Sequence, residues 1–180
     1  MPSDSRTSPP VGSPRVAPVA PGTRPELAEL EARIRGARGR LSPLYQVLLH
    51  SPQLAAGWEH LFTVIRQQTS VPARLRELVI LRIAVLNGAD YEFEAHVPHA
   101  LQAGMTQAAI DLLRKGEASG SESETVVLRY TDAMTRELQV PDALFEELRK
   151  HFDDKALVEL TATIAGYNMV SRFLIAMRIH

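Results

Sequence analysis

The chain has 180 residues, of which 45% are hydrophobic and 23% charged, and its formal net charge at pH 7 is -1. This size fits one domain with a sizeable core, and the near-neutral charge argues against a basic nucleic-acid-binding face or an acidic tail. The chain contains no cysteine, which excludes disulfides, thiolate nucleophiles, redox dithiols and cysteine-containing metal sites.

The first 24 residues are rich in Pro, Ser, Gly and Ala and show no apolar periodicity. Such a segment buries too little apolar surface to offset its ordering entropy. We therefore expect residues 1–24 to be a disordered tail and residues 25–180 to form a single domain. The chain shows neither a secretory signal nor an uninterrupted apolar stretch long enough to cross a membrane. We expect a cytoplasmic protein without a membrane or nucleic-acid partner.

Helix signals recur along the rest of the chain. Proline stands where helices often begin, at Pro25, Pro43, Pro52 and Pro72. The predicted helices span about residues 26–35, 43–50, 72–87, 90–103, 106–115, 123–138, 141–151 and 154–179, with a further amphipathic helix after Pro52. No useful length of sequence alternates β-branched with polar residues, so the predicted fold class is all-α. The last helix is apolar on most faces, which indicates a subunit interface.

The central pair of predicted helices, 72–87 and 90–103, carries a carboxylate in apolar surroundings. Glu77 directly precedes the run Leu-Val-Ile-Leu. An unpaired carboxylate there would be unfavourable, so Glu77 must be paired, hydrogen-bonded or protonated part of the time. Burial would raise its pKa towards the range useful in acid/base catalysis. An ion pair with Arg74 or Arg76 would instead give it a structural role, and both interpretations stay open.

Glu92 and His96 lie four residues apart and share one helix face. The carboxylate can orient the imidazole and raise its pKa, which would make His96 a proton shuttle near neutral pH. The pair could equally be a half-exposed structural contact. His99 and Glu77 add two more residues of metal-ligand type, but the spacing lacks the precedent of the H-E-x-x-H motif. We therefore expect no metal site.

Three segments carry a family resemblance: RLRELVILRIAVLNGADYEFEAHVPHALQAGMT, LSPLYQVLLHSPQLAAGW and LVELTATIAGYNMVSRFLIAMRI. Together they resemble the carboxymuconolactone decarboxylase family, which includes the AhpD-like alkylhydroperoxidases, over about residues 25–179. The resemblance implies an AhpD-like helical bundle that is an obligate homo-oligomer. The expected assembly is a trimer or hexamer, with a dimer as the alternative, and its sites lie close to subunit contacts.

In the peroxidase branch of this family a glutamate is followed by a C-x-x-C pair and then a histidine. Glu77 and His96 match the glutamate and the histidine, but the cysteine positions fall on Ala89 and Glu92. Neither residue can form a disulfide, so we expect no thiol peroxidase activity. Decarboxylase-type members also lack the cysteine pair and work without a cofactor. The resemblance therefore implies a cofactor-free lyase or isomerase for a small carboxylated lactone or carbonyl compound.

Within this interpretation three residues receive catalytic roles. His96 would be the general acid/base, and Glu77 would hold it, tune it or act as a second base. Glu92 would add an acid or a polar contact. The substrate-binding candidates are Tyr91 as a hydrogen-bond donor, Arg82 and Arg172 as cations for a substrate carboxylate, and Asn168, one turn before Arg172.

Two alternatives to a cofactor-free enzyme stay open from the sequence. The first is a catalytically silent AhpD-like oligomer that lost its dithiol and binds a ligand or partner. The second is a metal-dependent enzyme that uses Glu92, His96 and His99 as ligands.

Overall fold

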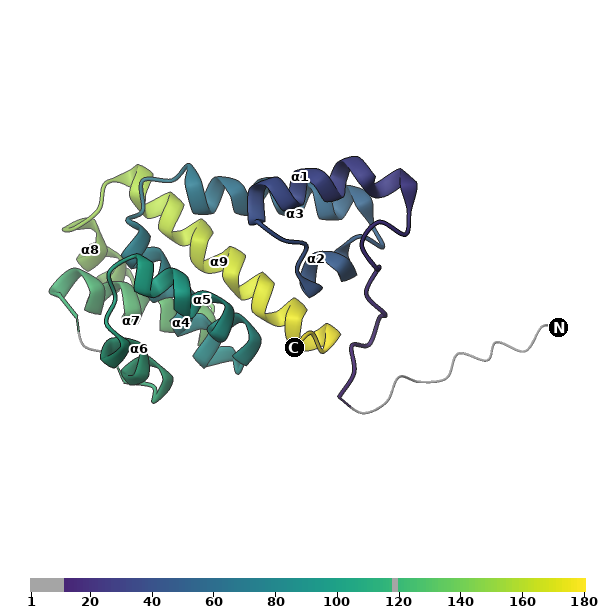
Figure 1. Cartoon of the computed structure of the whole chain (residues 1–180). Helices are drawn as coiled ribbons and strands as arrows, with labels where there is room; N and C mark the ends of the chain where they lie inside the picture. The colour runs from purple at the N-terminus through teal and green to yellow at the C-terminus, as the bar shows by residue number, and fades with distance from the viewer. Residues whose placement is uncertain (1–11, 118–119) are drawn as a thin grey trace. The chain divides into compact units, whose positions relative to one another are not determined.

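The computed structural model of the chain describes residues 12–117 and 120–180. Within these ranges the secondary structure is helical and no strand occurs, which confirms the all-α fold class (Figure 1). The helices are η1 (Pro25–Leu27), α1 (Ala28–Arg38), α2 (Pro43–Leu48), α3 (Pro52–Gln67), α4 (Ala73–Asn87), α5 (Asp90–Gln102), α6 (Gln107–Arg114), α7 (Glu122–Arg136), α8 (Asp142–Arg149) and α9 (Asp154–Met177). In the same ranges, no helix has the length and apolar character of a membrane span.

The chain divides into two compact units. Unit 1 comprises Met1–Glu59 and Leu174–His180, and unit 2 comprises His60–Phe173. The helices α3 and α9 each contribute residues to both units. The assignment of residues 25–180 to a single domain stays a prediction.

Unit 1 includes the described part of the predicted tail. Val19 is buried, and its N–H donates a 3.0 Å hydrogen bond to the carbonyl of Gln46. The N–H of Gly22 donates to both carboxylate oxygens of the buried Glu31, at 3.2 and 3.0 Å. Residues 12–24 thus make defined contacts without forming a helix. The rest of the predicted tail lies outside the described residues.

Most helix ends lie within a few residues of the predicted bounds and follow local sequence signals. The helix α4 ends at Asn87 and is capped by Gly88, whose φ of 68° lies in the left-handed region that favours glycine. At α7 the N-cap is Ser121, which forms a capping box with Glu124, so the helix begins before the predicted start at Ser123. Ser42 precedes α2 but makes no side-chain capping hydrogen bond.

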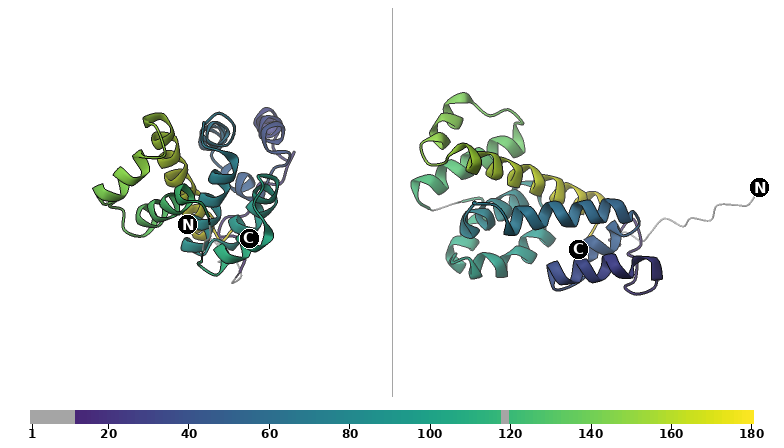
Figure 2. Two further views of the ribbon diagram at one scale, coloured as in Figure 1. Left: turned by 90° about the vertical axis from the view of Figure 1, so that its left-hand side faces the viewer. Right: turned by 90° about the horizontal axis from the view of Figure 1, so that it is seen from above.

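Unit 2 is built around α4, whose side chains are buried on nearly every side. This helix contacts α5, α6 and α7, and α7 in turn contacts α8 (Figure 1). Figure 2 shows α8 beside the first turns of α9. A helix that is buried on nearly every side does not carry its apolar residues along one face only. This explains why the sequence of α4 shows no single apolar face.

Close packing between α3 and α9 within unit 2 fixes the position of one aromatic side chain. A Cβ atom added at Gly166 would lie 3.1 Å from Cδ1 of Ile65, so the glycine permits a close approach. One residue later, the ring of Tyr167 meets the ring of Phe62 edge to face at 5.5 Å. This contact holds Tyr167 towards the ionisable residues of α5.

Candidate functional site

The turn between α4 and α5 brings the central ionisable residues together. The helix α4 ends at Asn87 and α5 begins at Asp90, so the two helices fold back on one another and make extensive contacts. Glu77, near the start of α4, therefore faces His96, in the middle of α5. The fold thus brings together two side chains that lie 19 residues apart in the sequence.

His96 is held between two carboxylates. Its Nδ1 lies 2.6 Å from Oε2 of Glu77, and its Nε2 lies 3.3 Å from Oε1 of Glu92. The exposed fractions are 5% for His96, 2% for Glu77 and 7% for Glu92, so all three residues are buried. The three sequence-predicted catalytic residues thus form one contiguous cluster.

Hydrogen bonds to the two carboxylates determine the charge of His96. Burial lowers the pKa of the imidazole, but hydrogen bonds to Glu77 and Glu92, together with their negative charges, raise it to about 9. Burial raises the pKa of the Glu77 carboxyl. The hydrogen bond with His96 and the charges of His96, Arg76 and Arg66 outweigh burial and lower that pKa overall. An imidazolium beside an ionised Glu77 is therefore favoured near neutral pH.

Tyr167 joins this cluster from α9. Its ring meets the ring of His96 edge to face, with the centroids 5.4 Å apart. Burial raises the pKa of the phenol, so the hydroxyl stays protonated at physiological pH. Tyr167 is not among the site residues selected from the sequence. The signal that could have indicated it is an aromatic residue with a polar tip inside the apolar last helix.

A cavity of about 370 Å³ opens beside the Glu77 carboxylate. Its walls come from α3, α4, α5 and their ends, and the lining residues are Arg66, Gln67, Ala73, Arg76, Glu77, His99, Gln102 and Ala103. Glu77 is the one buried residue of this set. The cavity has the volume typical of small-molecule pockets and places the Glu77–His96 pair in reach of a ligand.

Two arginines line this cavity, and neither is a cation selected from the sequence. Arg76 Nε lies 3.4 Å from Oε1 of Glu77. Arg66 donates from Nη2 to Nε2 of His99 at 3.3 Å. Burial, followed by the positive charges of Arg66 and His96, lowers the pKa of His99, so its ring is neutral near pH 7 and accepts this hydrogen bond.

The structure places Arg82 and Arg172 in other contacts. Arg82 forms a two-pronged ion pair with Asp132 of α7, at 2.7 Å for Nε–Oδ1 and 2.6 Å for Nη2–Oδ2. Arg172 is exposed, and its Nη2 lies 3.4 Å from the carbonyl oxygen of Thr135. Neither residue lines the cavity beside Glu77.

Asn168 belongs to a buried polar network instead. Its Nδ2 donates to Oγ1 of Thr135 at 3.0 Å and to the carbonyl of Ile164 at 3.1 Å. Its Oδ1 accepts from Nδ2 of Asn87 at 3.1 Å. Tyr91 is half-buried at the start of α5, one residue before Glu92, and it does not line the cavity.

The arrangement of the histidines bears on the metal alternative. The rings of His96 and His99 lie 5.5 Å apart between centroids and are tilted by 56°. Both ring nitrogens of His96 face a carboxylate. Within residues 12–117 and 120–180, no group of three histidine or carboxylate side chains has the geometry to hold a metal ion.

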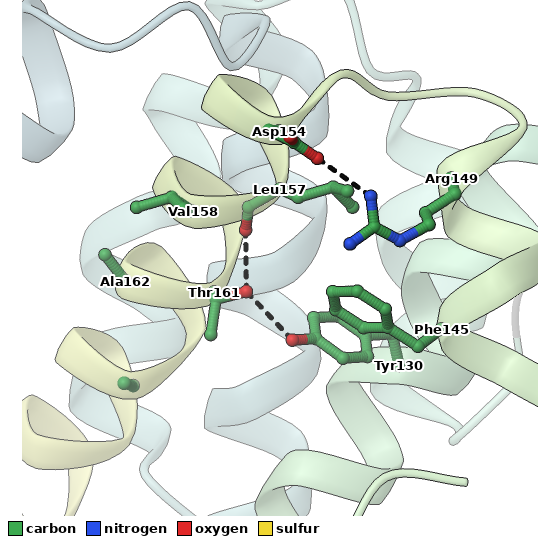
Figure 3. A pocket seen from close by; sticks show the side chains of 9 residues that line it. Tyr130, Phe145, Arg149, Asp154, Leu157, Val158, Thr161 and Ala162 are labelled. Atoms are coloured by element: carbon green, nitrogen blue, oxygen red, sulfur yellow. Dashed lines mark hydrogen bonds and ion pairs between the residues drawn. The ribbon is translucent and has the colours of Figure 1, made fainter. Parts of the chain in front are cut away.

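A second cavity of about 690 Å³ lies among α7, α8 and α9 (Figure 3). Its walls are mostly apolar, and the labelled side chains in Figure 3 include Leu157 and Val158. Its polar contacts are the hydrogen bond between Tyr130 and Thr161 at 2.8 Å and an ion pair between Arg149 and Asp154. These side chains already satisfy one another, and no second carboxylate–histidine cluster lines this cavity.

Comparison with known proteins agrees with this architecture. Residues 52–133 match the model of the carboxymuconolactone decarboxylase family. An uncharacterized protein of Bacillus subtilis, YdfG, is 29% identical over 115 residues, which cover 62% of this chain and 78% of the relative. The family match contains all three members of the Glu77–His96–Glu92 cluster.

Two solved structures share the fold. A protein of unknown function from Agrobacterium tumefaciens, described as a candidate AhpD antioxidant-defence protein, is 26% identical with a TM-score of 0.67, covering 73% of this chain and 92% of that one. The debrominase Bmp8, in a cysteine-to-alanine variant bound to 2,3,4-tribromopyrrole, is 21% identical with a TM-score of 0.76, covering 90% and 88%. Residues 52–133 are thus similar to the carboxymuconolactone decarboxylase family, and the solved structures show that the chain has an AhpD-like helical fold.

Proposed function

We propose that this protein is a cofactor-independent acid/base enzyme, a lyase or isomerase, that moves a proton on a small carboxylated lactone or carbonyl compound. The observation that carries the proposal is the buried imidazole held between two carboxylates, with one of them, Glu77, lining a cavity. Perturbed ionisable groups beside a cavity are typical of catalytic sites. The chain has no cysteine, so the proposed chemistry does not use a thiol.

Glu77 is the group of the cluster that meets both the cavity and the imidazole. In the proposed reaction, its carboxylate removes a proton from the carbon next to a carbonyl, and the electron pair of that C–H bond passes to the carbonyl oxygen as an enolate. Return of a proton to another atom completes an isomerisation. In a decarboxylation, the bond to the departing CO₂ breaks instead, and the same carbon receives a proton that the His96 imidazolium supplies through Glu77.

In this scheme His96 is the proton donor, because it is a cation while Glu77 is ionised. The 2.6 Å contact between Nδ1 and Oε2 lets a proton pass between His96 and Glu77 without a large movement. Glu92 supports the charged imidazole from the opposite side. Tyr167 packs against the ring and fixes its plane.

A second candidate is an anion-binding protein without catalysis. The contact between Arg76 and Glu77 at 3.4 Å favours it, because an arginine on the carboxylate makes Glu77 a weaker base. Within the described residues every buried side-chain nitrogen and oxygen has a partner, as expected of a structural network. Both the enzyme and the anion-binding protein would bind a ligand in the cavity. A measurement of turnover therefore distinguishes the two candidates.

The test is turnover of a panel of carboxylated lactones and β-keto acids by the wild type, Glu77→Gln and His96→Ala, with and without chelator. The proposal expects activity that chelator leaves unchanged and that falls at least ~10²-fold in both variants. Glu94→Gln, a change at an exposed residue of α5, the helix that carries His96, is the control and should keep full activity. Activity that survives both changes, or that chelator abolishes, would reject the proposal.

We also propose a homo-oligomer. The side of α9 that carries Val158 and Met169 leaves them 69% and 40% exposed, and the exposed Ala162 and Ala165 lie between them. The spacings of four, three and four residues form one stripe along the helix, as in helix–helix interfaces. Light scattering measures the molecular mass of the purified protein in solution and so tests this proposal. If the stripe is buried between copies, replacing Val158 with Glu should reduce the molecular mass of the assembly.

A further inference from the structure

We propose that the cavity beside Glu77 is a carboxylate-binding subsite in which Arg66 is the anchoring cation and His99 positions it. The inference deepens the proposed function, because it names the group by which a substrate is held. It rests on that function only for the orientation of the substrate. The binding itself requires nothing of the Glu77–His96 pair.

The first observation is that Arg66 is a half-buried cation without an acidic partner. It lies near the end of α3 and lines the cavity. Across the described ranges its hydrogen-bond partner is His99, and no carboxylate forms an ion pair with it. By contrast, Arg74 and Arg82 each hold a carboxylate in unit 2. A guanidinium left with spare donors in a cavity is suited to an anionic ligand.

The second observation is the neutral histidine that contacts the guanidinium. His99 Nε2 accepts from Nη2 of Arg66 at 3.3 Å, which uses one donor and leaves others free. A planar guanidinium fixed at one nitrogen presents its remaining N–H groups in a defined plane. A carboxylate matches this arrangement with two parallel hydrogen bonds.

The third observation concerns the composition of the rest of the cavity. Arg76 adds a second positive charge, whereas Gln67 and Gln102 add uncharged amides near the solvent-exposed edge. The charges of Arg66 and Arg76 exceed that of Glu77 by one, since His99 is neutral. One added negative charge therefore balances the cavity. The amides supply donors for a carbonyl or lactone oxygen of the same ligand.

Occupation of this subsite would place the reacting carbon next to Glu77. A bound carboxylate would also share the positive charge of Arg76 that now acts on Glu77. Weaker attraction from Arg76 raises the pKa of the Glu77 carboxyl and makes it a stronger base. The anchoring group and the base thus act on one substrate from neighbouring walls of the cavity.

The experiment measures binding, not turnover. Calorimetric titration of the full-length protein uses 5-oxotetrahydrofuran-2-carboxylate, its methyl ester, succinate and inorganic phosphate as probes. The wild type should bind the carboxylate at least ~10-fold more tightly than the ester and more tightly than phosphate. Arg66→Gln should weaken binding of the carboxylate at least ~10-fold and leave the ester unchanged. Arg136→Gln, an exposed change on α7, is the matched control and should have no effect.

The role of His99 is tested with two variants that differ in one property. His99→Gln keeps an acceptor for Arg66 and should retain most of the affinity, whereas His99→Leu removes the acceptor and should lose it. Equal affinities in these two variants would reject the positioning role. Circular dichroism melts establish that each variant is folded, and the wild-type comparison of acid with ester needs no variant at all.

The outcomes separate this inference from the proposed function. Equal binding of acid and ester, preference for phosphate, unaltered binding in Arg66→Gln, or no saturable binding of either carboxylate would overturn the subsite. Selective carboxylate binding that depends on Arg66, but without turnover of any panel compound, would support the subsite and count against the proposed catalysis.

Discussion

Nδ1 of His96 lies 2.6 Å from Oε2 of Glu77, although 19 residues separate them in the chain. Both side chains are buried, and a second carboxylate, Glu92, lies 3.3 Å from the other ring nitrogen. These charged groups lie in an apolar core, where an unpaired charge would be unfavourable. The α4–α5 turn brings opposite charges together, so each charge is compensated locally.

Replacing Glu77 with Gln should lower the pKa of His96 from its wild-type value of about 9. The amide removes the negative charge at Oε2, so the imidazolium loses one of its two carboxylate partners. Nuclear magnetic resonance titration of the His96 ring protons measures the change. The same titration of Glu94→Gln is the control, and an unchanged His96 pKa in Glu77→Gln would contradict the assigned cause.

The stability of the protein should depend on pH through His96. Its pKa is about 9 when folded and ordinarily 6.5, so its contribution to the free energy of unfolding is fully present below pH 6.5 and is lost as pH rises to about 9. Wild type should therefore lose on the order of 1–3 kcal/mol more than His96→Gln over this range. Urea unfolding at pH 6 and pH 9.5 measures it. Parallel pH profiles for the two proteins would be the contrary result.

Replacing Arg82 with Ala should destabilise the protein by on the order of 1–3 kcal/mol and leave ligand binding unchanged. Its guanidinium joins α4 to α7 through Asp132 and also donates to the carbonyl of Gly116 at 3.0 Å. Urea unfolding of Arg82→Ala, Asp132→Ala and the double variant should show strong coupling between the two sites. Loss of carboxylate binding in Arg82→Ala, with folding intact, would return Arg82 to the substrate site.

Replacing Asn168 with Ala should lower the free energy of unfolding by on the order of 1–3 kcal/mol. The change leaves Asn87 and Thr135 without one of their buried partners. Leu101→Ala, on α5 and 43% exposed, is the control and should have a smaller effect. Thermal unfolding measures both. Equal effects would mean that the buried network contributes little to stability.

Most helices could be predicted because proline starts, glycine ends and apolar periodicity act locally. The end of α4 at Asn87 and the start of α5 at Asp90 agree with the prediction. The start of α7 does not, because Ser121 and Ser123 both offer a capping hydroxyl. Only the position of Glu124, three residues after Ser121, decides between them.

The cluster of Glu77, Glu92 and His96 could also be selected from the sequence, because two of its members are helix neighbours and the third lies in an apolar run. The arginines at the cavity could not be selected in this way. Arg66 ends an amphipathic helix, where a cation is ordinary, and its lack of an acidic partner is a property of the tertiary structure. Arg82 is equally suitable by sequence, but in the structure its guanidinium is paired with Asp132.

The most direct test of the central claim is exchange of carbon-bound hydrogen in D₂O, because it detects proton transfer without requiring the complete reaction. Proton resonance spectra follow 4-oxopentanoate and 5-oxotetrahydrofuran-2-carboxylate with wild type, Glu77→Gln and His96→Ala. The account predicts that wild type accelerates deuterium incorporation next to the carbonyl, and that each variant loses at least ~10²-fold of this acceleration. Exchange that persists in both variants, or no exchange in a compound that binds to the wild type, would contradict it.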